Sequence, residues 1–92
     1  MMYAKKIKMR PGCGNSSNLQ EIAEIYVDGC NNPGFFPKET LHNHVKENPN
    51  SIKVFIDPYP SLLPATSQRG EKYVRSAPNQ YNLDNLLNLP RV

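Results

Sequence analysis

The sequence has no apolar run that approaches the roughly 20 residues a membrane-spanning helix needs, so we expect no membrane contact. The basic residues near the start are followed by Pro11 and Gly12 rather than by an apolar segment, which argues against a secretory leader. Cysteine is scarce, with two among 92 residues. These absences predict a cytoplasmic protein with reduced thiols.

The residue patterns of enzymes and metal sites are also missing. Cys13 and Cys30 are not in a C-x-x-C spacing, and the predicted hairpin between them separates them by about 23 Å, too far for a disulfide. His42 and His44 lie two apart in a predicted helix, on nearly opposite sides. No nucleophile–base pair or phosphate-binding loop stands out. We expect no catalytic residue, metal ligand or cofactor.

The composition that is present indicates one small domain covering residues 1–92. Only 38% of the residues are hydrophobic, and nine prolines and five glycines interrupt the chain, which predicts a thin core and short elements. The formal net charge is +3. Much of the positive charge lies within the first ten residues, on Lys5, Lys6, Lys8 and Arg10, whereas the rest of the chain is nearly neutral.

Hydrophobic periodicity predicts four strands and one helix. Residues 3–10 alternate: one face carries Tyr3, Ile7 and Met9 together with Lys5, and the other carries the basic residues Lys6, Lys8 and Arg10. Residues 20–28, 51–57 and 72–76 are typical of strands, and the residues after Pro37 predict a helix that ends at Asn48. Residues 11–18, 29–34 and 58–71 are expected to be loops.

This order predicts an α+β fold: a small antiparallel β-β-α-β-β sheet with one helix on a face and a short C-terminal helical turn. In the second strand, Ala23, Ile25 and Val27 are expected on one face, and Ile22 and Glu24 on the other. If the first two strands form a hairpin, Glu24 and Asp28 oppose the basic row and partly neutralise it.

The last residues repeat with a period of three. Leucines at 83, 86 and 89 would form one ridge in a tight helical turn, and Pro90 ends the pattern. So short a segment needs a surface to dock on. Docking on the protein's own sheet is preferred to docking in a partner's groove. We call this segment the C-terminal clasp; its residues are Asn82, Leu83, Asp84, Asn85, Leu86, Leu89 and Pro90.

The C-terminal sequence resembles that of a small, uncharacterised bacterial family of unknown function. Its signature is close to Y-[VL]-R-[TS], a turn, then D-N-L-x-x-L-P. Residues 73–76, Tyr-Val-Arg-Ser, match its first half, and residues 84–90 match its second half. The resemblance implies a compact single-domain protein and no particular activity.

Two surfaces are candidates for function. The first, expected to bind a protein partner, combines the 58–71 loop with neighbouring residues: Tyr59, Leu62, Leu63, Arg69, Tyr73 and Arg75. The second, an alternative, would bind single-stranded nucleic acid through Lys6, Lys8 and Arg10, with tyrosines as stacking partners. Arg75 either holds an anion or pairs with Asp84.

The sequence thus favours a non-enzymatic interaction or regulatory module, a monomer or weak homodimer, over a nucleic-acid-binding protein.

Overall fold

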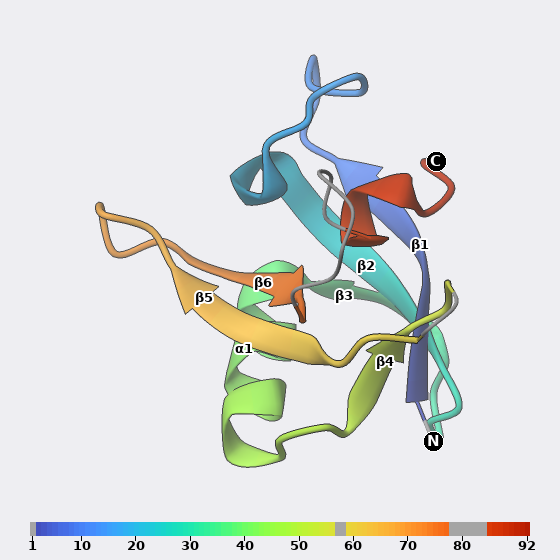
Figure 1. Cartoon of the computed structure of the whole chain (residues 1–92). Coiled ribbons are helices and arrows are strands. Elements are labelled where there is room, and N and C mark those ends of the chain that lie inside the picture. Colours follow the sequence, from blue (N-terminus) through green and yellow to red (C-terminus); the bar gives the residue numbers. More distant parts are fainter. Residues whose placement is uncertain (1, 57–58, 78–84) are drawn as a thin grey trace.

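The computed structural model describes residues 2–56, 59–77 and 85–92. Four strands form one sheet in the order β3-β2-β1-β4, and two more form an antiparallel pair (Figure 1). The predicted α+β class is confirmed. The elements in chain order are β1 (Met2–Met9), a 3₁₀ turn η1 (Leu19–Glu21), β2 (Ile22–Asp28), β3 (Gly34–Pro37), α1 (Lys38–Glu47), β4 (Ile52–Val54), β5 (Leu62–Thr66), β6 (Lys72–Ser76) and a 3₁₀ turn η2 (Asn85–Asn88).

The main sheet is mixed rather than purely antiparallel as predicted. β2 runs antiparallel to both β1 and β3, as expected for a hairpin and its extension, whereas β4 runs parallel to β1. β3 and β4 therefore point the same way at opposite edges of the sheet. Helix α1 carries the chain from β3 at one edge to β4 at the other. Because two strands joined by a helical crossover run in the same direction, β4 enters the sheet parallel to β3 and therefore to β1.

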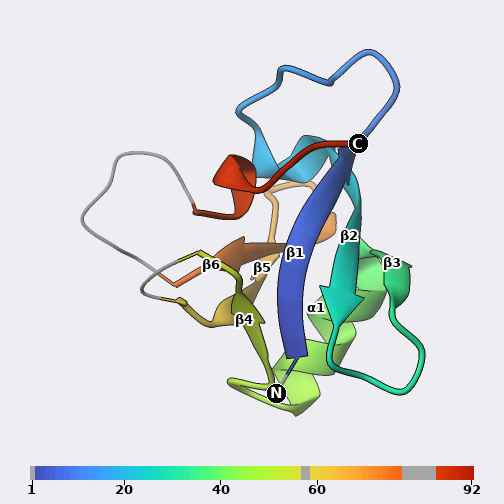
Figure 2. The ribbon, with the colours of Figure 1, turned by 90° about the vertical axis from the view of Figure 1, so that its right-hand side faces the viewer.

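The core lies between the main sheet, α1 and the β5–β6 hairpin. Helix α1 contacts β5 and β6 as well as β2 and β3, and Figure 2 shows the hairpin and helix behind β1 and β2. Leu41 and Val45 point into this core, as the helical spacing predicts. The other core residues are Ala4, Ile7, Met9, Ile22, Ile25, Val27, Ile52, Val54, Leu62, Val74, Leu86, Leu87 and Leu89.

Two bulges change which residues face the core. The register of β1 and β2 shifts between Ala4 and Lys6, and again between Lys8 and Met9. Each bulge adds one residue to one strand and reverses the alternation beyond it. Tyr3 therefore lies on the face opposite Ile7, and Ile22, 1% exposed, joins the core. The simple alternation predicted for these two residues is wrong.

Two strands occupy segments that were expected to be turn or loop. β3 begins in the predicted 29–34 turn, and β5 lies within the predicted 58–71 loop. Both contain a proline, a residue that lacks an amide donor and disfavours central strands. Both are short strands in which proline is tolerated, Pro37 at the end of β3 and Pro64 opposite Val74 in the two-stranded sheet.

The described part of the C-terminal clasp docks on the core of its own chain. Leu86 and Leu89 are 0% and 4% exposed, and the Ile7 amide donates to the Pro90 carbonyl oxygen at 2.9 Å. The Val92 amide returns a bond to the Ile7 carbonyl oxygen at 3.1 Å. The chain end thus pairs in parallel with the second half of β1, while β4 pairs with its first half. Asn82, Leu83 and Asp84 lie outside the described residues.

Candidate functional site

The outer face of the main sheet carries a regular array of aromatic and charged side chains. Three rows cross the strands: Tyr26 lies between Phe35 and Lys6, Tyr3 lies between Asp28 and Lys53, and Glu24 pairs with Lys8. The intervening rows face the core. We call this surface the outer face; it also includes Lys5 at the β1 bulge and Phe55 and Tyr59 after β4.

The rings on the outer face form two groups. Tyr3, Phe55 and Tyr59 form a cluster in which Tyr3 meets Phe55 edge-on at 5.3 Å between centroids and Tyr59 at 6.2 Å. Tyr26 and Phe35 form a second edge-to-face pair at 5.4 Å. Phe55, Tyr59 and Phe35 are 46%, 45% and 37% exposed. Edge-to-face packing fixes the rings while leaving parts of their faces open.

Lysines stand beside both ring groups. The Lys5 ammonium lies 4.8 Å from the Phe55 ring centre, and that of Lys6 lies 5.5 Å from Tyr26. These distances lie within the cation–π range. Aromatic and cationic groups are therefore interleaved across the sheet rather than segregated.

Acidic groups neutralise part of this positive charge. Lys5 donates to Asp28 at 2.9 Å, and Lys8 lies 3.9 Å from Glu24. Hydrogen bonds from Lys5 and from the Gly29 amide lower the pKa of the Asp28 carboxyl. Lys6 has no acidic partner within salt-bridge distance among the described residues. The outer face keeps a modest positive excess centred on Lys6.

Arg10 belongs to a different structure from Lys6 and Lys8. Its guanidinium pairs with Glu71, which also accepts a hydrogen bond from the buried Lys38 ammonium at 2.6 Å. Lys38 also donates to the Gln20 carbonyl oxygen. The Lys38 hydrogen bond is the main cause of the lowered Glu71 pKa. Arg10 thus links the end of β1 to the β5–β6 hairpin.

The six residues predicted to form a protein-binding surface are divided by the fold. Leu62 is 1% exposed in the core, so its assignment to that surface is wrong. Tyr59 and Arg69 lie at opposite ends of β5, and Arg69 lines a shallow depression with Tyr73 beside the hairpin turn. Arg75 is exposed, and its predicted partner Asp84 lies outside the described residues. Leu63 is half-buried.

Cys13 and Cys30 are free thiols, as predicted. Cys13 donates to a Glu21 carboxylate oxygen at 2.7 Å, and Ser16 donates to the other oxygen at 2.5 Å. The bond to Glu21 and partial burial raise the pKa of the Cys13 thiol. A raised pKa lowers the fraction of reactive thiolate at a given pH.

The two histidines occupy different environments. His42 is buried, and its Nδ1–H donates to the Tyr73 carbonyl oxygen at 2.9 Å. His44 lies beside a separate apolar pocket. No cluster of three or more histidine, cysteine or acidic side chains suited to a metal occurs in the parts of the chain that the structure describes. In those same parts, no helix has the length and apolarity to cross a membrane.

Sequence reasoning missed the outer face as a unit, although its signals were present. Phe55 and Lys53 alternate with buried Ile52 and Val54, so their shared exposure followed from the pattern. Tyr3 was placed on the wrong face because the bulge at Lys5 leaves no mark in the residue types. Phe35 follows the predicted 29–34 loop and was not expected in a strand, whereas it belongs to β3.

Comparisons with curated proteins and with solved structures give no match. A family described as a protein of unknown function, DUF3892, matches residues 4–90, which is nearly the whole chain. This agrees with the unknown function implied by the resemblance of the C-terminal sequence. The chain belongs to the DUF3892 family.

Proposed function

We propose that this protein is a non-enzymatic binding module that holds single-stranded nucleic acid on the outer face of its main sheet. The observation that carries the proposal is the interleaving of exposed rings with lysines on one sheet face. Single strands are bound by aromatic side chains on which bases stack and by cations that contact the phosphates. Sheet faces with exposed aromatic residues are a recurrent form of this arrangement.

The two ring groups offer two stacking positions. Phe55 and Tyr59 are nearly half exposed and lie beside Tyr3, while Phe35 and Tyr26 lie across the sheet, on the far side of β1. Neighbouring strands lie about 4.8 Å apart, so the groups are separated by roughly 10–15 Å. A short strand of a few nucleotides spans that distance.

The charge of the outer face predicts weak binding with a shallow salt dependence. Lys6 is free of acidic partners among the described residues, whereas Lys5 and Lys8 must exchange Asp28 and Glu24 for phosphates. Two or three phosphate contacts give a slope of about −1.5 to −2 in log affinity against log salt for single strands. Stacking would supply much of the remaining affinity.

A protein partner is the second candidate. Phe35 and Phe55 are exposed and have no polar atom on the ring, which suits anchors in a partner's apolar pocket. The lysines around them would then form a polar rim. A protein partner would then bind at the outer face and not at the 58–71 segment.

Fluorescence polarisation with labelled single-stranded DNA, single-stranded RNA and duplex DNA at two salt concentrations tests the first candidate. We expect both single strands to bind more tightly than the duplex, and higher salt to weaken binding. Phe55→Ala combined with Tyr59→Ala should lower affinity at least tenfold, because stacking on each ring is worth about 1–3 kcal/mol. Lys6→Glu should lower affinity and flatten the salt dependence.

Lys46→Glu is the matched control. Lys46 is exposed on α1, outside the outer face, so this variant makes the same change in net charge without altering the proposed site. Equal losses for Lys6→Glu and Lys46→Glu would show that only net charge matters. Absence of single-strand binding at low salt would refute the nucleic-acid proposal and leave the protein partner as the candidate.

The proposed role needs no catalytic group. The free thiols suit the reducing cytoplasm. We propose that the protein acts there as a monomer or weak homodimer.

A further inference from the structure

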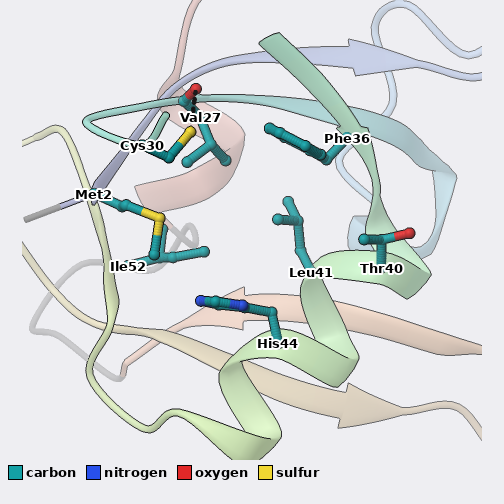
Figure 3. A pocket seen from close by; sticks show the side chains of 8 residues that line it. All are labelled: Met2, Val27, Cys30, Phe36, Thr40, Leu41, His44 and Ile52. Atoms are coloured by element: carbon teal, nitrogen blue, oxygen red, sulfur yellow. Dashed lines mark hydrogen bonds between the residues drawn. The ribbon is translucent and has the colours of Figure 1, made fainter. Parts of the chain in front are cut away.

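A pocket lies between helix α1 and the inner face of the main sheet, away from the outer face. The pocket has a volume of about 200 Å³ and is partly open to solvent (Figure 3). Its walls come from four strands or their ends and from one side of α1, so the fold itself shapes it. The lining residues are Met2, Val27, Cys30, Phe36, Thr40, Leu41, His44 and Ile52.

The walls are almost entirely apolar. Val27, Leu41 and Ile52 are core residues, and Phe36 and the two sulfur-containing side chains pack against that core. An apolar surface of this kind favours an apolar occupant, because transfer of such a molecule from water is favourable. Engineered apolar cavities of about 150 Å³ bind benzene, so this pocket has room for one substituted ring.

One polar atom in this region has no partner. His44 Nε2 is buried, and no hydrogen bond reaches it from the residues that the structure describes. Figure 3 shows the His44 ring extending along one side of the pocket toward Met2 and Ile52. A buried nitrogen without a hydrogen bond is costly, and a ligand that supplies the bond removes that cost.

We infer that this pocket binds a small one-ring molecule whose single hydroxyl group hydrogen-bonds to His44 Nε2. The ring packs against the apolar walls, and the hydroxyl group supplies the hydrogen bond that the nitrogen lacks. A hydroxyl both donates and accepts, so it suits either tautomer of the imidazole. The inference is independent of the nucleic-acid proposal, because none of the lining residues belongs to the outer face.

The probe pair 4-methylphenol and para-xylene isolates the hydrogen bond. The two molecules have nearly the same shape, and one carries a hydroxyl where the other carries a methyl group. Titrations followed by methyl NMR signals of Leu41 and Ile52, and by the imidazole ¹⁵N signals, give both dissociation constants. The quantity of interest is the ratio of the 4-methylphenol affinity to the para-xylene affinity.

We expect His44→Leu to lower this ratio at least fivefold relative to the unaltered protein, since one hydrogen bond is lost. His44→Gln keeps a hydrogen-bonding group and should retain part of the preference. Lys46→Ala, an exposed change on the same helix, should leave the ratio unchanged. An equal ratio in the His44→Leu variant and the unaltered protein would overturn the inference, as would failure of both probes to bind.

Alkylation of Cys30 gives a readout that needs no change at His44. In a Cys13→Ser background Cys30 is the sole thiol, and it is partly exposed at the pocket wall. Saturating 4-methylphenol should slow its reaction with iodoacetamide severalfold. An unchanged rate would place the probe elsewhere and refute this pocket as its site.

Discussion

The two faces of the main sheet are built from the same strands, yet they carry different kinds of side chain. Ile25 faces inward and is fully buried, and its neighbour Tyr26 faces outward against Phe35. The inner face is aliphatic and closely packed, whereas the outer face has aromatic rings and lysines that the core does not require. Removing a residue from the inner face should cost stability, and removing one from the outer face should chiefly cost binding.

Alanine substitutions at Ile25 and Tyr26 test this difference most directly. Ile25→Ala should lower the free energy of unfolding by about 2–5 kcal/mol, because it leaves a cavity in a thin core. Tyr26→Ala should cost about 1 kcal/mol or less, the scale of a cross-strand pair. Urea denaturation measures both. Similar losses for the two variants would show that the faces are not energetically distinct.

The Leu86→Ala substitution tests whether the C-terminal clasp contributes to stability as the inner face of the sheet does. Leu86 is fully buried in η2, so we expect a loss of about 2–4 kcal/mol and a fall in melting temperature of roughly 10 °C or more. The matched change Asn88→Ala alters an exposed residue of the same turn and should be nearly neutral. A melting temperature unaffected by Leu86→Ala would show that the clasp adds nothing to the core.

Acid titration compares carboxyl groups in the two regions. Glu71 accepts a hydrogen bond from buried Lys38, and Asp28 accepts one from Lys5 on the outer face. These bonds lower the pKa of both carboxyl groups in the folded state. Their stabilising contributions are complete above the unfolded-state pKa values of about 4.3 and 3.9, and disappear as the pH falls through the folded values.

Glu71→Gln and Asp28→Asn should therefore each flatten the loss of stability on acidification below about pH 4.5. We expect the larger change from Glu71→Gln, because Lys38 is 1% exposed and its pair is less screened by water. Melting temperatures between pH 2.5 and 7 measure the effect. A steeper acid limb in either variant would contradict the assigned pairs.

The smallest effect concerns Lys8 and Glu24 on the outer face. Their charged groups lie 3.9 Å apart, and the side chains are 55% and 36% exposed. A double-mutant cycle with Lys8→Ala and Glu24→Ala should give a coupling of about 0.5 kcal/mol or less, reduced further by salt. A much larger coupling would mean that the outer face contributes to the fold beyond its role in binding.

The α+β class, the first hairpin, the helix and the last strand could all be predicted from periodicity and capping signals. Ile52 and Val54, and Leu41 and Val45, follow the spacing that burial imposes on a strand and a helix. The bulges at Lys5 and Ala23 could not be predicted, because they depend on how two strands pair and not on the residues of either one. For the same reason the face of Tyr3 was misassigned.

The candidate sites also differ in how far they could be predicted from local sequence patterns. Lys6 and Lys8 were identified as an exposed basic row, since alternation alone reveals it. The aromatic half of the outer face depends on β3 and on the segment after β4, which the crossover by α1 places at opposite edges of one sheet. The pocket beside His44 had no signal in the sequence, because its walls come from five separate elements.

The pairing of residues 90–92 with Ile7 has a consequence for how the protein folds. Half of one edge of β1 is completed by β4, and the other half by residues that lie far along the chain from β1. Until these segments have docked, β1 exposes unpaired amides and carbonyl oxygens of the kind that recruit other chains. A chain in which these distant segments have not yet docked is therefore open to mispairing along this edge of β1.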